Sequence, residues 1–155
     1  KRYDLAVKAA TKLNKKLIVF GNGPAHDQLV KIAGPTVEFR TDRFGDASDA
    51  EYEKAITTAR GFIYPAEEDF GIVSVEALAA GAPVIGLARG GTTDIVTSPD
   101  IGTLFQHQTV DDIVKAIKIA EQTRFYPSKL ARTAKRFDKG LFLTKIRKVV
   151  RDNTP

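Results

Sequence analysis

Cysteine, methionine and tryptophan are absent from this chain of 155 residues, and histidine occurs only twice. Without cysteine the chain has no disulfide, no thiolate zinc site and no cysteine nucleophile. His26 and His107 are too few for a histidine-rich metal site. No apolar run approaches the roughly 18 residues that a membrane-spanning helix needs, and the opening residues 1–4 do not resemble a secretory signal. We therefore expect a cytoplasmic protein.

The charge of the chain is unevenly distributed. The net charge is +5, but residues 1–123 carry 14 basic and 17 acidic side chains, whereas residues 124–155 carry ten basic and two acidic. A uniformly basic nucleic-acid-binding domain does not have this distribution, so we expect no nucleic-acid partner. Apolar residues make up 43% of the chain, which suffices for one core. We predict a domain over 1–123 and basic C-terminal helices over 124–155.

Short apolar runs alternate with longer stretches of helical periodicity. The predicted strands cover 17–20, 36–39, 61–64, 83–87 and 102–105. The predicted helices cover 4–13, 25–33, 49–60, 72–80, 110–123, 128–137 and 141–151, with a short helix before the last strand. Strands separated by helices indicate an α/β fold with right-handed crossovers, a Rossmann-like doubly wound parallel sheet. Ligands bind beyond the carboxyl ends of the strands in such sheets.

Glycines follow two of the predicted strands. Gly21 and Gly23 lie at the turn after Phe20, where backbone can approach a ligand and the next helix start attracts anions. A similar loop at 88–94 could hold a phosphate or a sugar. A tight turn without a ligand remains the alternative at both places. The charged loop at 40–45 is either solvated surface or a contact to a base or phosphate.

The segment 65–81 carries the most chemical information. Three consecutive acids at 67–69 precede a helix start, where Asp69 could act as a cap. Glu76 lies among apolar and small residues, so we expect a buried helix with a carboxylate that needs partners. Helical side chains lean toward the helix N-terminus, which directs Glu76 toward Glu68. A polyhydroxyl or phosphate ligand would satisfy this site. A structural pair of Glu76 with Arg89 or Lys1 is the alternative.

The segment from Glu68 to Glu76 resembles the E-x7-E motif of family-four retaining GT-B glycosyltransferases. Residues 77–85 are similar to the E-A-hydrophobic-A-x-G-x-P-V-I continuation of this motif, and 19–24 resemble the family's V-x-G-x-G-P turn. Residues 90–96 resemble the G-G-x-x-E/D-x-V loop, and 1–7 resemble the stretch after the first strand of the nucleotide-sugar domain. The matches run in order over about 1–120. The resemblance implies the second half of a GT-B fold.

The resemblance also implies a role for each matched residue. Glu76 would bind ribose hydroxyls, and Glu68 would bind the donor sugar near the reacting carbon. Lys1 would neutralise the diphosphate leaving group, which makes Lys1 and Glu68 the expected catalytic residues. The other expected contacts to the nucleotide sugar are Phe70, Gly71, Ile72, Val73, Gly21, Gly23, Arg40 and Thr41.

Two departures from the family pattern shape the functional prediction. The family's first strand, with its diphosphate-binding arginine, and its N-terminal domain should precede Lys1. We therefore expect a fragment that binds a nucleotide-diphosphate sugar and transfers nothing alone. The acidic block at 67–69 and the 89–91 loop resemble mannosyltransferase-like members, which favours GDP-mannose over a UDP-hexose. No Asp-x-Asp occurs, so we expect no metal and no other cofactor. The acceptor would be a glycan or a lipid-linked sugar.

Three questions remain open at the level of sequence. Another GT-B enzyme, such as a nucleotide-sugar epimerase, is the alternative enzyme, and a non-catalytic α/β nucleotide-binding module is the alternative outside enzymes. The apolar stripe over 141–151, flanked by basic residues, is either a helix that docks on the missing N-terminal domain or an interfacial helix on anionic lipid. The second reading would place the protein at the cytoplasmic membrane face.

Overall fold

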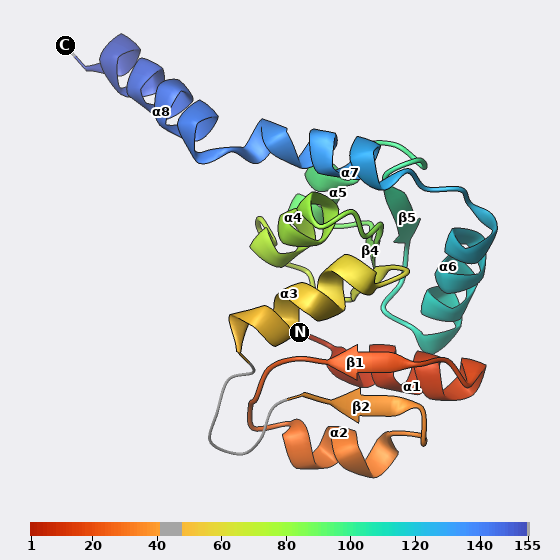
Figure 1. The fold of residues 1–155 in the computed structure, drawn as a ribbon. Coiled ribbons are helices and arrows are strands. Elements are labelled where there is room, and N and C mark those ends of the chain that lie inside the picture. Colours follow the sequence, from red (N-terminus) through yellow and green to blue (C-terminus); the bar gives the residue numbers. More distant parts are fainter. Residues whose placement is uncertain (41–47, 155) are drawn as a thin grey trace.

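The fold is given by a computed structural model that describes residues 1–40 and 48–154 (Figure 1). Strands and helices alternate along the chain as the sequence predicts. The strands are β1 (Leu17–Val19), β2 (Val37–Phe39), β3 (Phe62–Tyr64), β4 (Val84–Leu87) and β5 (Gly102–Phe105). The helices are α1 (Tyr3–Leu13), α2 (His26–Ile32), α3 (Asp49–Thr58), α4 (Ile72–Ala79), α5 (Gly91–Ile95), α6 (Val110–Gln122), α7 (Pro127–Ala134) and α8 (Lys139–Asn153), with a 3-10 turn at Lys135–Phe137.

Every strand pair in the described residues is parallel. The pairs form two groups, β1–β2 and β3–β4–β5, and no described strand joins β1 to β3. The doubly wound strand order is 3-2-1-4-5-6. Without the first strand of this order, the remaining strands form the groups 3-2 and 4-5-6. These groups correspond to β2–β1 and β3–β4–β5 in the structure. The α/β fold of parallel strands and crossover helices is therefore confirmed, and it occurs in two groups of strands rather than one continuous sheet.

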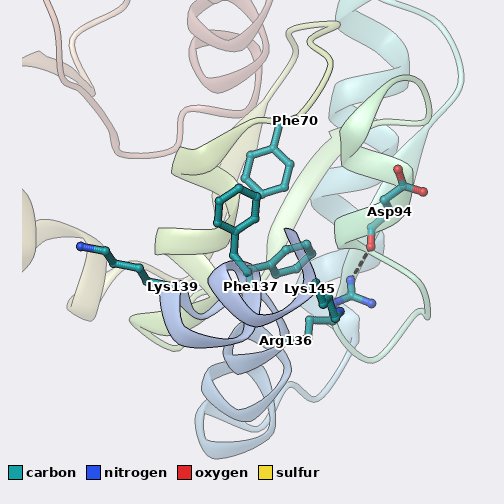
Figure 2. A pocket seen from close by; sticks show the side chains of 7 residues that line it. Phe70, Asp94, Arg136, Phe137, Lys139 and Lys145 are labelled. Carbon is teal, nitrogen blue, oxygen red and sulfur yellow. Dashed lines mark hydrogen bonds between the residues drawn. The ribbon is translucent and has the colours of Figure 1, made fainter. Parts of the chain in front are cut away.

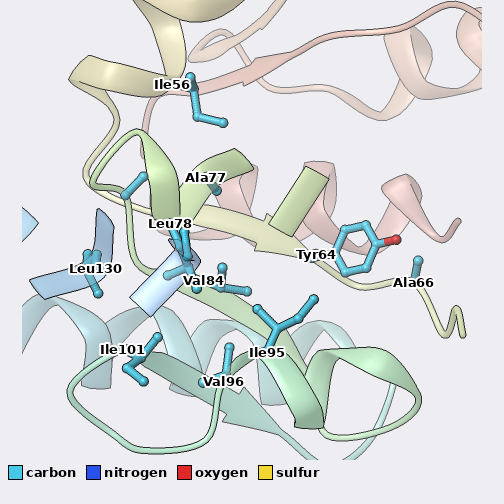
Figure 3. Close-up of a cluster of buried hydrophobic side chains, with 12 residues drawn as sticks. Ile56, Tyr64, Ala66, Ala77, Leu78, Val84, Ile95, Val96, Ile101 and Leu130 are labelled. Carbon is cyan, nitrogen blue, oxygen red and sulfur yellow. The ribbon is translucent and has the colours of Figure 1, made fainter. Parts of the chain in front are cut away.

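The two faces of β4 are covered by different helices. Val84 packs in a cluster with residues of α3, α4 and α7, among them the fully buried Leu78 and Leu130 (Figure 3). Ile85 and Leu87 pack on the opposite face with residues of α1 and α6. All four residues of β4 are buried, as expected for a parallel strand between two helical layers. The buried position of β4 determines where the loop at its carboxyl end lies.

Local sequence signals account for several helix ends. Ser48 and Glu51 form a capping box at the start of α3, and the Thr109 hydroxyl accepts a hydrogen bond from the Asp112 N–H at the start of α6. After α4, Gly81 has φ +87° and faces Pro127, the first residue of α7. A Cβ at Gly81 would lie 2.9 Å from Cβ of Pro127. Glycine at this position therefore lets α7 approach the end of α4.

The basic C-terminal segment divides into two parts. Helix α7 lies against α4 and buries Leu130 and Ala134. Helix α8 extends away from the rest of the fold (Figure 1), and none of its residues is buried. Its exposed apolar side chains are Leu141, Phe142, Ile146, Val149 and Val150. Across the described ranges, no helix is both long enough and apolar enough to cross a membrane.

Candidate functional site

The loops after β3 and β4 meet at the carboxyl edge of the sheet. The Gly91 N–H donates a hydrogen bond to the carbonyl oxygen of Glu68 at 2.9 Å. A Cβ on Gly90 would lie 2.3 Å from that carbonyl oxygen, and one on Gly91 would lie 2.4 Å from the carbonyl oxygen of Asp69. Both distances are shorter than any real contact, so these glycines are what allows the two loops to touch.

Glu68 is held from two sides. The Tyr64 hydroxyl donates a hydrogen bond to Oε2, and Nζ of Lys1 lies 3.0 Å from Oε1. Tyr64 is only 2% exposed, whereas the side chain of Glu68 is 32% exposed. The structure thus brings together the two residues expected to be catalytic, with the carboxylate still open to solvent.

Glu76 is exposed, and the expectation that it is buried is wrong. The α4 helix buries Ser74, Ala77 and Leu78 and turns its other side outward. The Tyr52 hydroxyl donates a hydrogen bond to Oε2 of Glu76 at 3.2 Å. Neither predicted structural partner pairs with Glu76.

The two cations proposed as partners of Glu76 lie elsewhere. Lys1 pairs with Glu68, and Arg89 lies 3.7 Å from Glu67. In both pairs the cation is exposed, so each pair contributes little to stability. The carboxylate of Glu76 therefore keeps one oxygen with no partner identified among the described residues.

The α4 helix begins without a side-chain cap. Its N-cap is Gly71, at φ +83°, so the alternative in which Asp69 caps the helix is wrong. A Cβ on Gly71 would lie 3.1 Å from the Tyr64 ring, so glycine allows this turn to lie close against the ring. Ile72, at the start of the helix, is 63% exposed, and Val73 packs partly into the core. First-turn N–H groups that no side chain caps form an anion-binding helix end.

The turn after β1 lies next to the residue that holds Glu76. The Phe20 ring meets the Tyr52 ring edge to face at 5.5 Å between centroids. Gly21 has φ +110°, and a Cβ on Gly21 or Gly23 would meet nothing within 4 Å. A side chain at either position would therefore point into open space.

The loop after β2 is described only at its start. Arg40 is exposed, and its guanidinium lies 2.6 Å from the carboxylate of Glu38. The backbone N–H of Arg40 donates a hydrogen bond to the carbonyl oxygen of Val19. Thr41, the other predicted contact to a base, lies outside the described residues.

Hydrogen bonds and burial set the ionisation of the site. The pKa of Glu68 is lowered, first by the hydrogen bond from Tyr64 and then by that from Lys1. The hydrogen bond to Glu68 raises the pKa of Lys1. Burial, reinforced by Glu76, raises the pKa of Tyr52 to about 12. Burial and Glu68 likewise raise the pKa of Tyr64 well above its usual range. At neutral pH the site thus holds an ionised carboxylate between a protonated phenol and an ammonium group.

Two residues of this arrangement, Tyr52 and Tyr64, are missing from the sequence prediction. The position of Tyr64 offered a signal, because it ends a predicted strand four residues before Glu68. Tyr52 offered none, because its contact with Glu76 depends on how α3 lies beside α4.

A separate cavity of about 620 Å³ lies beyond Phe70 (Figure 2). Its lining residues are Phe70, Asp94, Arg136, Phe137, Lys139, Phe142 and Lys145. Phe70 meets Phe137 edge to face at 5.5 Å, and Arg136 donates to the carbonyl oxygen of Ile95 at 2.7 Å. Of the predicted site residues, only Phe70 lines this cavity. Among the described residues, in this cavity or outside it, no group of three or more metal-ligating side chains is close enough together to hold a metal.

Comparisons with known proteins agree with the predicted fold. The chain is 20% identical to AviGT4, a glycosyltransferase involved in avilamycin A biosynthesis, with a TM-score of 0.66 over 94% of this chain and 44% of that one. It is 17% identical to the lipopolysaccharide outer core galactosyltransferase WaaB, with a TM-score of 0.78 over 99% of this chain and 46% of that one. These likenesses confirm the fold of one part of a GT-B glycosyltransferase.

Sequence comparison identifies the family. The sulfoquinovosyl transferase SQD2 of Arabidopsis thaliana is 31% identical over an alignment of 157 positions, which covers 95% of this chain and 30% of that protein. The chain thus spans about a third of the length of this curated relative. The family model of glycosyl transferases group 1 matches residues 1–137, a range that contains both carboxylates, both tyrosines and the supporting glycine loops. On this match the chain belongs to the glycosyl transferases group 1 family.

Proposed function

We propose that this chain is the donor-binding part of a retaining, family-four glycosyltransferase. The whole enzyme would transfer a hexose from a nucleotide-diphosphate sugar to a glycan or lipid-linked acceptor. The observation that carries this proposal is the arrangement at the carboxyl edge of the strands. There, Glu68 and Glu76 each accept a hydrogen bond from a tyrosine, and the uncapped start of α4 lies between them in sequence.

The polar groups of the site match the parts of a nucleotide sugar. Carboxylate oxygens accept hydrogen bonds from hydroxyl groups, so Glu76 would bind the ribose and Glu68 the donor hexose. The N–H groups of Ile72 and Val73 begin α4 and would face the diphosphate. Phe70 and Gly71 would border the sugar, and Gly21 and Gly23 the opposite wall.

Lys1 would stabilise the departing diphosphate. Its ammonium group lies 3.0 Å from Glu68 and its side chain is 56% exposed, so it can turn from the carboxylate to a bound phosphate. A cation placed where negative charge develops lowers the barrier to departure of the leaving group. We propose that this lysine and the helix end serve in place of a metal, and that removal of divalent cations leaves nucleotide binding unchanged.

The base and sugar of the donor are proposed from the sequence resemblance. The acidic block at 67–69 and the 89–91 loop favour GDP-mannose, with a UDP-hexose as the alternative. Two of the similar proteins are named for sulfoquinovose and galactose, which supports a hexose-type donor but not mannose. Arg40 and Thr41 are the residues proposed near the base.

We propose that a further strand inserts between β1 and β3 in the whole enzyme. The gap in pairing lies where the doubly wound order has its first strand. Within the described residues, β1 pairs only with β2, and β3 pairs only with β4. A missing central strand would weaken donor binding by leaving one wall of the site incomplete. We therefore expect weak nucleotide binding and no sugar transfer by this chain alone, so detectable transfer by it would contradict this part of the proposal.

We further propose that α8 docks on the part of the enzyme outside this chain. The chain covers 44% and 46% of the two similar structures, so each has a further part of comparable size. The exposed apolar side chains of α8 have no cover within the described residues. Phe142, at the start of this face, also lines the cavity beside Phe70, so docking there would border the donor site.

A flotation experiment on the longer enzyme separates docking from lipid binding. We expect it to remain unbound to vesicles of phosphatidylcholine and phosphatidylserine. Val149→Asp should weaken association between this chain and the separately produced remainder. If the enzyme floats with anionic vesicles and Val149→Asp abolishes this flotation, the docking proposal is wrong and 141–151 contacts the membrane instead.

Isothermal titration tests the proposed donor binding. The chain is titrated with GDP-mannose, UDP-glucose, GDP and UDP, and the titrations are repeated on Glu76→Ala. We expect one nucleotide series to bind and the variant to lose that binding, which would also name the base. Binding that Glu76→Ala leaves unchanged would contradict the proposed ribose contact. No binding at millimolar ligand, in this chain and in a version extended N-terminally, would contradict the function itself.

A further inference from the structure

We propose that Tyr64 and Tyr52 are positioning residues, Tyr64 for the carboxylate that meets the donor sugar and Tyr52 for the carboxylate that meets the ribose. This inference rests on the proposed function and adds two residues to it. Each tyrosine contacts one glutamate of the E-x7-E pair, from a different element of the fold. The proposal therefore assigns a separate support to each half of the donor.

Tyr64 is fixed by its surroundings. It ends β3, its ring is buried in the cluster with Ala77, Leu78 and Val84, and the turn at Gly71 lies against the ring. A buried ring in this position has little freedom, so its hydroxyl stays directed at Oε2 of Glu68. A carboxylate held in this way is preorganised to accept hydrogen bonds from the sugar hydroxyls.

Tyr52 connects three parts of the site. It lies on α3, its ring meets that of Phe20 after β1, and its hydroxyl donates to Glu76 on α4. Without this bond, an exposed carboxylate on a helix surface would sample several rotamers. Tyr52 thus couples the orientation of Glu76 to the turn that carries Gly21.

The charged groups around the two tyrosines give them different roles. Glu68 also contacts Lys1, so it is held by a phenol and an ammonium group, and its pKa is lowered mainly by the phenol. Glu76 receives only the Tyr52 hydroxyl among the described contacts. Loss of Tyr64 should therefore leave Glu68 partly oriented by Lys1, whereas loss of Tyr52 should free the Glu76 side chain.

Replacement of each tyrosine by phenylalanine keeps the ring and removes only the hydroxyl. Tyr52→Phe should weaken binding of both the nucleoside diphosphate and the nucleotide sugar about tenfold, which corresponds to about 1.4 kcal/mol of binding free energy. Tyr64→Phe should weaken binding of the nucleotide sugar by a smaller factor, because Lys1 still contacts Glu68, and should leave binding of the nucleoside diphosphate unchanged. Tyr126→Phe is the matched control, because Tyr126 is exposed beside Arg124 and contacts neither carboxylate.

The carboxyl pKa of Glu68, followed by ¹³C NMR without any ligand, provides an independent measurement. Tyr64→Phe should raise this pKa, and Tyr52→Phe and Tyr126→Phe should not. A merely structural role for Tyr64 would lower the melting temperature without this selective change. If Tyr52→Phe and Tyr64→Phe both bind as the wild type does, and the pKa of Glu68 is unaltered, the inference about the tyrosines is overturned and the proposed function stands. Absence of wild-type binding in the extended version would instead overturn the proposed function on which it rests.

Discussion

The amide of Gly91 donates to the carbonyl of Glu68, so the backbone of the loop after β4 supports the backbone of the loop that carries the catalytic candidate. Gly90, the preceding residue, lies at φ +58° against the same carbonyl. The side chain of Glu68 is thus fixed by Tyr64 and Lys1, while its backbone is fixed by the Gly90–Gly91 turn. The position of this carboxylate depends on contacts from three separate segments of the chain.

Gly91→Ala should separate these two loops. A Cβ there would lie 2.4 Å and 2.5 Å from the carbonyl oxygens of Asp69 and Phe70, and backbone cannot move away cheaply. We expect a loss of about 2–3 kcal/mol in the free energy of unfolding, seen as a melting temperature lower by about 6 °C or more. Gly23→Ala is the control, because a Cβ there meets open space. Equal melting temperatures for the two variants would contradict the close contact.

The Lys1–Glu68 pair should act within a defined pH range. The pKa of Glu68 is lowered from 4.5, so the stabilisation is present above that value and is lost as the pH falls through the lowered pKa. The pKa of Lys1 is raised from 10.5, so the stabilisation is present below that value and is lost as the pH rises through the raised pKa. The pair should therefore be intact at neutral pH.

Lys1→Ala tests this pair. Because Lys1 is exposed, the variant should lose less than about 1 kcal/mol of stability, and less still at high salt. It should nevertheless raise the pKa of Glu68, which ¹³C NMR measures. Lys8→Ala, another lysine near the N-terminus, is the control. An unchanged Glu68 pKa in Lys1→Ala would show that the ammonium group does not contact the carboxylate in solution.

Tyr52 should ionise late in alkaline titration. Burial and the neighbouring Glu76 raise its pKa from 10.0 to about 12. The stabilisation that the protonated phenol provides is therefore present below pH 10 and is lost as the pH rises through the raised pKa of about 12. Tyr52→Phe should remove one phenolate transition near pH 12 from the ultraviolet absorbance. Glu76→Gln should lower the Tyr52 pKa only in part, since burial is the larger cause. The same titration curve for Glu76→Gln and wild type would rule out the hydrogen bond.

The two C-terminal helices should respond differently to truncation of an apolar side chain. Leu130 of α7 is fully buried in the cluster around β4, so Leu130→Ala should cost about 2–4 kcal/mol of stability. Ile146 of α8 is 40% exposed and belongs to neither core cluster of the described residues, so Ile146→Ala should change stability by less than about 0.5 kcal/mol in this chain. Urea unfolding measures both. A large effect at Ile146 would show that α8 folds back onto the domain.

The fold was largely predictable because its signals are local. Continuous apolar runs marked the strands, and Ser48, Thr109 and Gly81 are residue types that favour helix ends, which is where the structure has them. The burial of α4 was not predictable from composition. Ile72, Glu76 and Ala79 follow one another at helical spacing and all face outward, so an almost wholly apolar helix buries only one side. Apolar content alone does not say which face of a short helix is covered.

The candidate site was predictable in part. The E-x7-E spacing identified both carboxylates, and the contact between Lys1 and Glu68 agrees with a shared site. The hydrogen bonds from the tyrosines depend on tertiary packing, since Tyr52 and Glu76 lie 24 residues apart on different helices. The contact of the 68–70 loop with Gly90 and Gly91 likewise depends on two neighbouring strands ending at the same level.

The most direct test of donor binding is a titration of ¹⁵N-labelled chain with GDP and UDP, followed amide by amide in NMR spectra. The account predicts that one nucleotide shifts the signals of Gly21, Gly71, Ile72, Val73 and Glu76, and that Glu76→Ala reduces those shifts. Signals of α8, such as that of Val149, should stay in place. Shifts confined to the cavity around Phe137 and Phe142, with none at the start of α4, would contradict the account.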